Sequence, residues 1–157
     1  MREPSNQSIS MTTQFLKQII PWLFKWEGTK YENDPDDPGG ETRYGIDKRS
    51  HPKEDIRNMT SERATQIYWD DYYMKYRCDH MRSPMDWVLF NACVNCGWKR
   101  ASKLLIESQG IPSRYLKAQA DFYRRLVALR PASRKYLKGW LARLEDLSKV
   151  LNLTPQL

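Results

Sequence analysis

The fold is indicated by one stretch in the first third of the chain, which reads Trp26-Glu27-Gly28-Thr29-Lys30-Tyr31-Glu32-Asn33-Asp34-Pro35-Asp36-Asp37-Pro38-Gly39-Gly40-Glu41-Thr42-Arg43-Tyr44-Gly45-Ile46. Ahead of it, apolar residues recur at helical spacing over 15–26, and Pro21 predicts a kink or a new start within that helix. From residue 28 to about 58 the helical period stops, and Asp, Pro and Gly dominate. Turn chemistry this dense predicts an ordered loop, in which Tyr44-Gly45-Ile46 is a short extended piece.

The rest of the chain is predicted to be helical. Apolar periodicity, with Thr60 and Ser113 as caps and Pro131 as a stop, predicts helical segments at about 60–72, 83–96, 101–110, 113–130 and 132–151. With 157 residues the chain is long enough for one compact domain. We therefore expect a mainly α fold, a single helical domain with a long structured N-terminal loop or a small β-hairpin.

Composition excludes several classes of protein. Apolar residues make up 40% of the chain and charged residues 29%, which fits neither a disordered nor a fibrous protein. No stretch approaches the roughly 18 uninterrupted apolar residues of a transmembrane helix, so we expect no stable membrane insertion. Residues 1–10 are polar and do not resemble a signal peptide. We expect synthesis in the cytoplasm, so that a protein acting outside the membrane would need a separate route to carry it there.

The positive charge of the chain is concentrated in its last third. The formal net charge is +7, and residues 113–149 contain ten Lys and Arg against three Asp and Glu, so residues 1–112 are neutral in sum. Within that neutral part, five acidic residues fall between Glu32 and Glu41. This polarity suits an anionic polymer such as nucleic acid or bacterial cell wall. A solvated helix face is the alternative explanation.

The cysteines and histidines do not form a recognisable metal or disulfide pattern. Cys78, Cys93 and Cys96 are odd in number, and His51 and His80 have no paired spacing with them. We expect small buried thiols in a reduced compartment, with no metal site and no cofactor.

Glu27 is the leading candidate for a catalytic residue. It follows Trp26 at the end of the first helix and precedes Gly28. Partial burial and the negative end of the helix dipole both disfavour an ionised carboxylate there, which suits a general acid. A Glu near a helix end is more often solvated surface, and this is the alternative.

Asp36 and Asp37 are the candidates for a second carboxylate. Asp36 stands nine residues after Glu27, and Thr42 stands six residues after Asp36. The turn Asp37-Pro38-Gly39-Gly40 could fold the loop back across a cleft, and Thr42 could hold a water or the second carboxylate. Two carboxylates in opposed environments are the equipment for glycosidic bond cleavage. Asp is also a common turn former, so at least one of these acids is expected to be structural.

The same stretch resembles the N-terminal motif of glycoside hydrolase family 108, which comprises lysozyme-like N-acetylmuramidases found as phage endolysins and as bacterial proteins once called secretion activators. Similar segments follow at 64–73, 89–97 and 122–143. The resemblance implies a lysozyme-like fold and gives Glu27 the role of catalytic acid. Thr29-Lys30 stand where the family usually has one Gly, so the partner acid stays open between Asp36 and Asp37. Asn91 replaces an Asp that the family often shows.

Aromatic and basic residues fit a sugar-binding cleft. Aromatic rings can stack on pyranose faces, although core packing is the commoner fate of any one ring. The candidates for substrate stacking are Tyr44, Trp69, Tyr72, Tyr73 and Trp98. Arg43 could pair with the lactyl or peptide carboxylates of the cell wall.

The sequence therefore predicts a peptidoglycan hydrolase that cleaves the bond between N-acetylmuramic acid and N-acetylglucosamine. The alternatives are a lytic transglycosylase or chitinase of the same fold, a non-catalytic wall-binding or secretion-assisting module, and a basic nucleic-acid binder, for which no recognition motif is found. We expect a monomer whose partner is peptidoglycan rather than nucleic acid. We expect it to act in the periplasm or cell wall after holin-like release or dedicated export. The expected organisation is a flexible N-terminus (1–11), a catalytic region (12–111) and C-terminal helices resembling a peptidoglycan-binding part (112–157) in the same domain.

Overall fold

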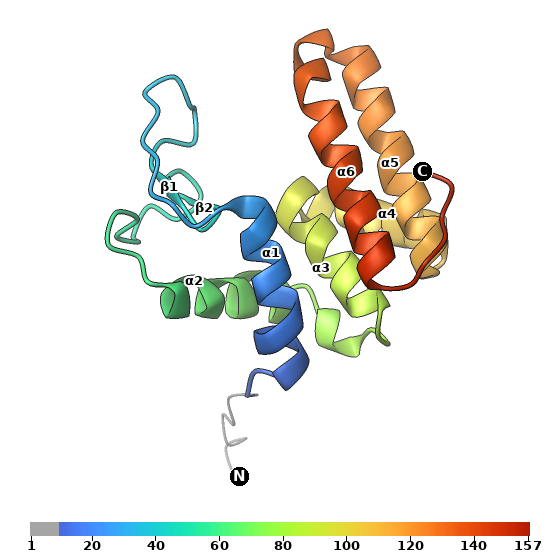
Figure 1. Ribbon diagram of the computed structural model, residues 1–157, viewed down its shortest axis with the longest axis horizontal. Helices are drawn as coiled ribbons and strands as arrows, with labels where there is room; N and C mark the ends of the chain where they lie inside the picture. The colour runs from blue at the N-terminus through green and yellow to red at the C-terminus, as the bar shows by residue number, and fades with distance from the viewer. Residues whose placement is uncertain (1–9) are drawn as a thin grey trace, which may run out of the picture. The chain divides into compact units, whose positions relative to one another are not determined.

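The computed structural model describes residues 10–157, so most of the expected flexible N-terminus lies outside the described residues. Helices dominate, and the mainly α fold predicted from the sequence is confirmed. The chain divides into two compact units, one ending at Trp69 and the other formed by Asp70–Leu157 (Figure 1). This division falls inside the region predicted as catalytic (12–111), and the predicted domain boundaries stay a prediction.

The first unit opens with a π-helical turn, Phe15–Ile19, that runs directly into α1 (Ile20–Glu27). Pro21 lies in the first turn of α1, where its missing N–H is tolerated, so it marks the new start that the sequence allowed. Phe15, Ile19 and Leu23 are fully buried along one face. The helix ends at Gly28, whose φ of 80° stops it directly after Glu27.

A small antiparallel hairpin follows, made of β1 (Thr42–Arg43) and β2 (Ile46–Asp47), with Arg43 opposite Ile46. Tyr44 and Gly45 both have positive φ, 54° and 77°, as the two central residues of a type I′ turn require. The predicted extended piece at Tyr44-Gly45-Ile46 is therefore wrong for its first two residues, because they form the turn between two strands. The predicted small hairpin itself is present.

Helix α2 (Ser61–Tyr68) completes the first unit. As the sequence predicts, Thr60 caps it, because the hydroxyl of Thr60 accepts a hydrogen bond from the backbone N–H of Arg63 at 3.1 Å. The helical path continues without interruption as a π-helical turn, Trp69–Met74, in which the boundary between the two units lies.

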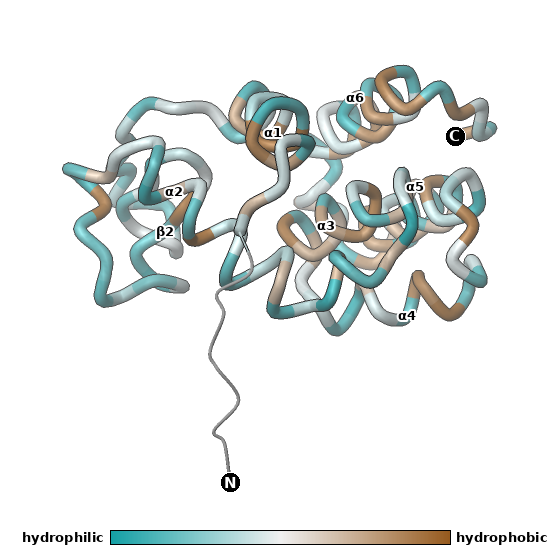
Figure 2. The backbone as a smooth tube through the Cα atoms, turned by 90° about the horizontal axis from the view of Figure 1, so that it is seen from below, coloured by the Kyte–Doolittle hydropathy of each residue, from teal (hydrophilic) through white to brown (hydrophobic). Residues whose placement is uncertain are grey.

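The second unit consists of four α-helices and two short 3-10 turns, Cys78–His80 and Pro131–Ser133. The helices are α3 (Met85–Cys96), α4 (Trp98–Ser108), α5 (Pro112–Leu129) and α6 (Arg134–Val150). The first nine residues of α3 are all buried, and Figure 2 shows brown, hydrophobic residues along it. Helices α5 and α6 lie side by side as an antiparallel hairpin (Figure 1).

The three cysteines are free thiols, two of them buried and Cys96 half-buried. Burial raises the pKa of the Cys96 thiol. Among the described residues, no helix has the length and apolar character needed to cross a bilayer.

Candidate active site

Glu27 lines a hollow of about 560 Å³ in the first unit. The hollow lies where α1 ends, and its wall is completed by the loop after α1 and by the hairpin. Its lining residues are Pro21, Phe24, Lys25, Glu27, Gly28, Thr29, Lys30, Glu32, Thr42 and Gly45. Of the residues predicted from the sequence as catalytic, the structure therefore brings Glu27 and Thr42 together.

The hairpin turn packs directly against Glu27, and Gly45 is the residue that allows this approach. A Cβ on Gly45 would lie 2.8 Å from Oε2 of Glu27 and 2.5 Å from the hydroxyl oxygen of Tyr68. That hydroxyl donates a hydrogen bond to the carbonyl of Tyr44 at 2.7 Å, which fastens the turn to α2. The turn thus limits the positions that the Glu27 side chain can take. Residue 45 needs to be glycine for two reasons: its φ is positive, and a side chain there would collide with Glu27 and Tyr68.

Glu32 brings a second carboxyl group to the same hollow. The backbones of Glu32 and Thr42 exchange two hydrogen bonds, each of 2.8 Å, and form an isolated antiparallel bridge. Residues paired in this way present their side chains on the same face of the sheet, and both line the hollow with Glu27. The sequence analysis did not single out Glu32. The available signal was its place in an acidic run five residues after Glu27, but the pairing with Thr42 is visible only in three dimensions.

Asp36 and Asp37 are exposed and do not line the hollow. Oδ1 of Asp37 accepts a hydrogen bond from the backbone N–H of Gly39 at 2.8 Å, and Oδ1 of Asp34 accepts one from the N–H of Asp36 at 2.9 Å. These contacts are the local side-chain turns typical of aspartate. They support the expectation that at least one of these acids is structural, and the role of Asp36 or Asp37 as a partner of Glu27 stays a prediction.

Arg43 and Tyr44 belong to the hairpin but do not line the hollow. Nη1 of Arg43 donates to the carbonyl of Arg57 at 2.9 Å, and its guanidinium lies 5.4 Å from the centre of the Tyr44 ring. The Tyr44 ring in turn contacts Phe24, with 4.9 Å between the ring centres. Arg43 thus ties the hairpin to the following loop, and its contact with substrate carboxylates stays a prediction.

Two lysines supply positive charge to the hollow, which Arg43 does not line. Lys25 and Lys30 are exposed, and both line the hollow together with Glu27 and Glu32. The hollow therefore presents two ammonium groups and two carboxyl groups, with Pro21 as part of an apolar wall. This lining suits a ligand that has apolar faces and carries carboxylates of its own.

The other predicted stacking residues have different environments. Trp69 is buried in the first unit, where its ring contacts Phe15 edge-on at 4.9 Å. Tyr73 is buried in the second unit and donates to Oδ2 of the buried Asp86 at 2.8 Å. These two rings pack in cores and offer no open face to a sugar.

Tyr72 and Trp98 are the predicted stacking residues of the second unit that keep exposed surface. Tyr72 is half-buried, and Trp98 is 39% exposed while stacking on Tyr76 with 5.0 Å between ring centres. A contact with substrate stays a prediction for these two residues and for Tyr44.

Asn91 is buried within the second unit, far along the sequence from the hairpin. Its Oδ1 accepts a hydrogen bond of 2.9 Å from Nε of Arg143, which is itself buried. The side chain that departs from the family pattern therefore links α3 to α6, and we assign it a structural contact.

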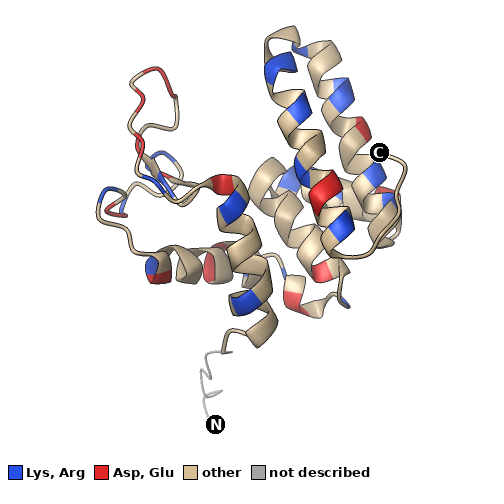
Figure 3. Cartoon of the chain, viewed as in Figure 1, with Lys and Arg blue, Asp and Glu red and all other residues tan. Residues whose placement is uncertain are grey.

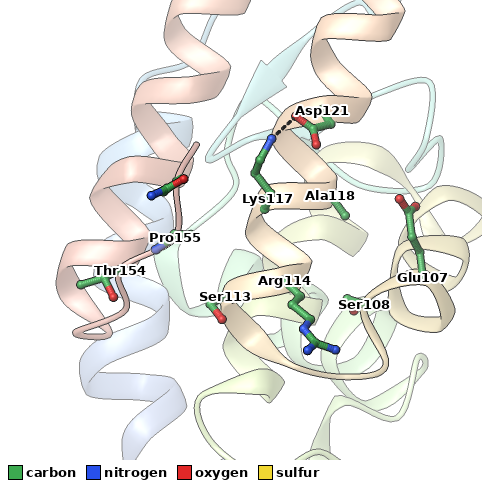
Figure 4. A pocket seen from close by; sticks show the side chains of 10 residues that line it. Glu107, Ser108, Ser113, Arg114, Lys117, Ala118, Asp121, Thr154 and Pro155 are labelled. Carbon is green, nitrogen blue, oxygen red and sulfur yellow. Dashed lines mark hydrogen bonds and ion pairs between the residues drawn. The ribbon is translucent and has the colours of Figure 1, made fainter.

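A second hollow, of about 430 Å³, lies in the second unit (Figure 4). It is bordered by the end of α4, by α5 and by the C-terminal segment, and the ion pair between Lys117 and Asp121 crosses part of its wall at 2.6 Å. None of the residues predicted as catalytic or substrate-binding lines it. The predicted catalytic residues Glu27 and Thr42 line the other hollow, in the first unit.

Comparison with known proteins identifies the family. The model of glycosyl hydrolase family 108 matches residues 20–97, which include α1, the hairpin and the hollow. The chain belongs to the glycosyl hydrolase 108 family. Membership of this family supports a glycoside hydrolase whose substrate is a carbohydrate such as peptidoglycan. Among curated proteins, no sequence matches the chain.

The fold of this family member is shared with a solved structure, that of Brucella abortus SagA. The two superpose with a TM-score of 0.70 at 24% sequence identity, over 88% of this chain and 94% of the other. At that identity the likeness shows the fold, and it confirms the lysozyme-like, mainly α architecture predicted from the sequence.

Proposed function

We propose that this family 108 member hydrolyses the glycan of peptidoglycan between N-acetylmuramic acid and N-acetylglucosamine, with Glu27 as the general acid. The observation that supports this most directly is the place of Glu27, at the end of α1, half-buried in a hollow that is open to a ligand. Lys25 and Lys30 on the rim suit the carboxylates of muramic acid and of the wall peptides.

In the proposed reaction, Glu27 gives its proton to the glycosidic oxygen as the bond between that oxygen and the anomeric carbon breaks. A water molecule adds to the anomeric carbon and loses a proton to a second carboxylate, so that one water is consumed and two sugar ends are released. The Gly45 turn holds the Glu27 side chain from one side, which limits the positions that its carboxyl group can take.

For the second carboxylate, the geometry favours Glu32. Glu32 and Thr42 are paired through their backbones and line the hollow with Glu27, whereas Asp36 and Asp37 do not. Glu32 would accept the proton of the attacking water or stabilise the developing positive charge, and the hydroxyl of Thr42 would orient that water.

The test is the lysis of purified cell walls, followed by turbidity, with mass analysis of the released fragments. Glu27→Gln should abolish clearing, while Glu62→Gln, the same change at an exposed residue of the first turn of α2, should leave it intact. Fragments with reducing N-acetylmuramic acid ends are expected. Anhydro ends would show a lytic transglycosylase, and binding to walls without any new reducing ends would show a non-catalytic wall-binding module.

The choice of second carboxylate is tested by three matched variants. Glu32→Gln should lower kcat by about 10²–10⁴-fold, as expected for loss of a general base. Asp36→Asn and Asp37→Asn should change kcat by far less, and the amide oxygen in Asp37→Asn can still accept the hydrogen bond from the N–H of Gly39, so the turn is kept. A large loss in Asp36→Asn with normal kcat in Glu32→Gln would return the role to Asp36.

A further inference from the structure

The end of the α5–α6 hairpin, residues 124–138, has an unusual surface that the proposed hydrolase chemistry does not explain; we call it the hairpin tip. It contains six cationic residues and no carboxylate: Arg124, Arg125, Arg130, Arg134, Lys135 and Lys138. All six are exposed. Figure 3 shows this end of the hairpin with blue and no red, in contrast to the lower parts of α5 and α6. Within the described residues, Arg124 is the one paired with a carboxylate, that of Asp121 at 3.3 Å.

Large apolar side chains are exposed among these cations. Leu129, the last residue of α5, is 81% exposed, and Tyr136 in the first turns of α6 is 53% exposed. Pro131 and Ala132, in the 3-10 turn between them, are exposed as well. Leu129 gains little from the fold of its own chain at this exposure, and with Tyr136, Pro131 and Ala132 it brings several exposed apolar residues to the tip.

Stacked aromatic rings hold α5 and α6 together next to the hairpin tip. Tyr136 stacks on Trp140 with 5.8 Å between ring centres, and Trp140 stacks on Tyr123 of α5 with 5.0 Å. Because these rings tie α6 to α5 immediately beneath the tip, the cations and Leu129 are presented on a supported surface. Little ordering is then needed when a partner binds.

We propose that the hairpin tip docks on the surface of an anionic phospholipid bilayer. The cations match the anionic headgroups, and Leu129 and Tyr136 match the apolar layer beneath them, where tyrosine rings are favoured at the interface. A soluble anionic polymer would satisfy the cations but would leave Leu129 in water. The bilayer is the partner that accounts for both features of the tip.

Docking of this kind places the protein on a membrane without crossing it. Each Lys or Arg near an anionic surface strengthens binding by about fivefold, and added salt weakens this part of the attraction. Reversing two of the charges, in R130E/R134E, changes the tip by four charge units and should weaken binding by on the order of a hundredfold or more. Leu129→Ser removes the apolar contact and should weaken binding about tenfold.

The experiment is co-sedimentation of the full chain with large vesicles of phosphatidylcholine alone or of phosphatidylcholine mixed in equal parts with phosphatidylglycerol. The wild-type chain should sediment with the mixed vesicles, release with added salt and stay in solution with phosphatidylcholine alone. The control K99E/K103E makes the same charge change on exposed residues of α4 and should keep binding within about threefold of wild type. Thermal unfolding of each variant identifies any that fail to fold.

Three results would overturn the proposal. The first is no binding to mixed vesicles. The second is an equal loss in R130E/R134E and K99E/K103E, which would show that net charge alone decides binding. The third is that Leu129→Ser binds mixed vesicles as tightly as wild type and that DNA or purified cell wall competes with the vesicles for the protein. Together these two observations would assign the tip to an anionic polymer. None of these results depends on Glu27, because the assay can be run with the Glu27→Gln variant.

Discussion

Replacing Gly45 with alanine tests the close packing of the hairpin turn against Glu27. The added Cβ would meet the Tyr68 hydroxyl at 2.5 Å and both Oε2 and Cβ of Glu27 at 2.8 and 2.9 Å, all inside normal contact distance. Alanine at a φ of 77° costs about 1–2 kcal/mol, because its Cβ crowds the backbone in the left-handed region. Overpacking adds about 1–3 kcal/mol.

Gly40→Ala is the matched control for this experiment. Gly40 has a similar φ of 74° and lies in the same loop, but a Cβ there would meet Lys48 at 3.8 Å, an ordinary contact. Gly40→Ala should therefore lose about 1–2 kcal/mol of unfolding free energy from backbone strain, without the further loss caused by overpacking. The difference between the two variants isolates the contact with Glu27 and Tyr68.

Urea unfolding gives the two free energies, and clearing of cell walls gives the activity. We expect Gly45→Ala to lose about 2–5 kcal/mol, a large part of the roughly 5–15 kcal/mol typical of a domain, and to lose activity even where it is fully folded, because Glu27 is displaced. Equal stability and equal activity in the two variants would refute the packing argument, since it would show that the turn does not bound the Glu27 side chain.

Three other changes have expected outcomes. Tyr73→Phe removes the donor to the buried Asp86 carboxyl and should destabilise the second unit by about 1–3 kcal/mol, seen as a melting temperature several degrees lower in circular dichroism. The hydrogen bond from Arg63 lowers the pKa of Glu54 in the folded protein. This pair therefore stabilises the fold at pH values above the pKa that Glu54 has in the unfolded chain, and the stabilisation is lost as the pH falls through the lower pKa of the folded protein. Glu54→Gln should therefore cost less than about 1 kcal/mol at pH 7 and nothing in strong acid, whereas a constant difference across pH would contradict this. Lys30→Gln should raise KM several-fold for wall fragments with free carboxylates and leave KM for amidated fragments unchanged, as measured by reducing-end release.

The helices could be predicted from the sequence because their signals are local. Thr60 caps α2 as expected, and the buried stripe of α3 is readable from its apolar run. The start of α5 differs by one residue from the prediction, because Pro112 takes the first helical position and Ser113 makes no capping hydrogen bond. Errors of this size arise because several residues near a helix end satisfy the same local rule.

The hairpin was harder to predict because it depends on positive φ angles at two consecutive residues, Tyr44 and Gly45. Tyr44 is a residue that favours strands, yet it has a φ of 54° in the turn. It is held there by the hydrogen bond from the Tyr68 hydroxyl, a residue 24 positions away that no local pattern connects to it. Tertiary contact thus overrides local propensity at the point where the turn reaches Glu27.

The proposed second carboxylate, Glu32, illustrates why spacing along the chain alone does not determine a site. Counting from Glu27 selects Asp36, but a loop of this length can take up or lose a residue without changing where its strand pairs. The pairing of Glu32 with Thr42 fixes which side chains share a face, and Glu32 lies on the face that lines the hollow. Beyond it, Asp34 turns back to bind the N–H of Asp36, so the chain leaves the sheet before Asp36 is reached. The carboxylates of Asp34 and Asp37 therefore shape the turn, whereas Glu32, which precedes them, lines the hollow with Glu27.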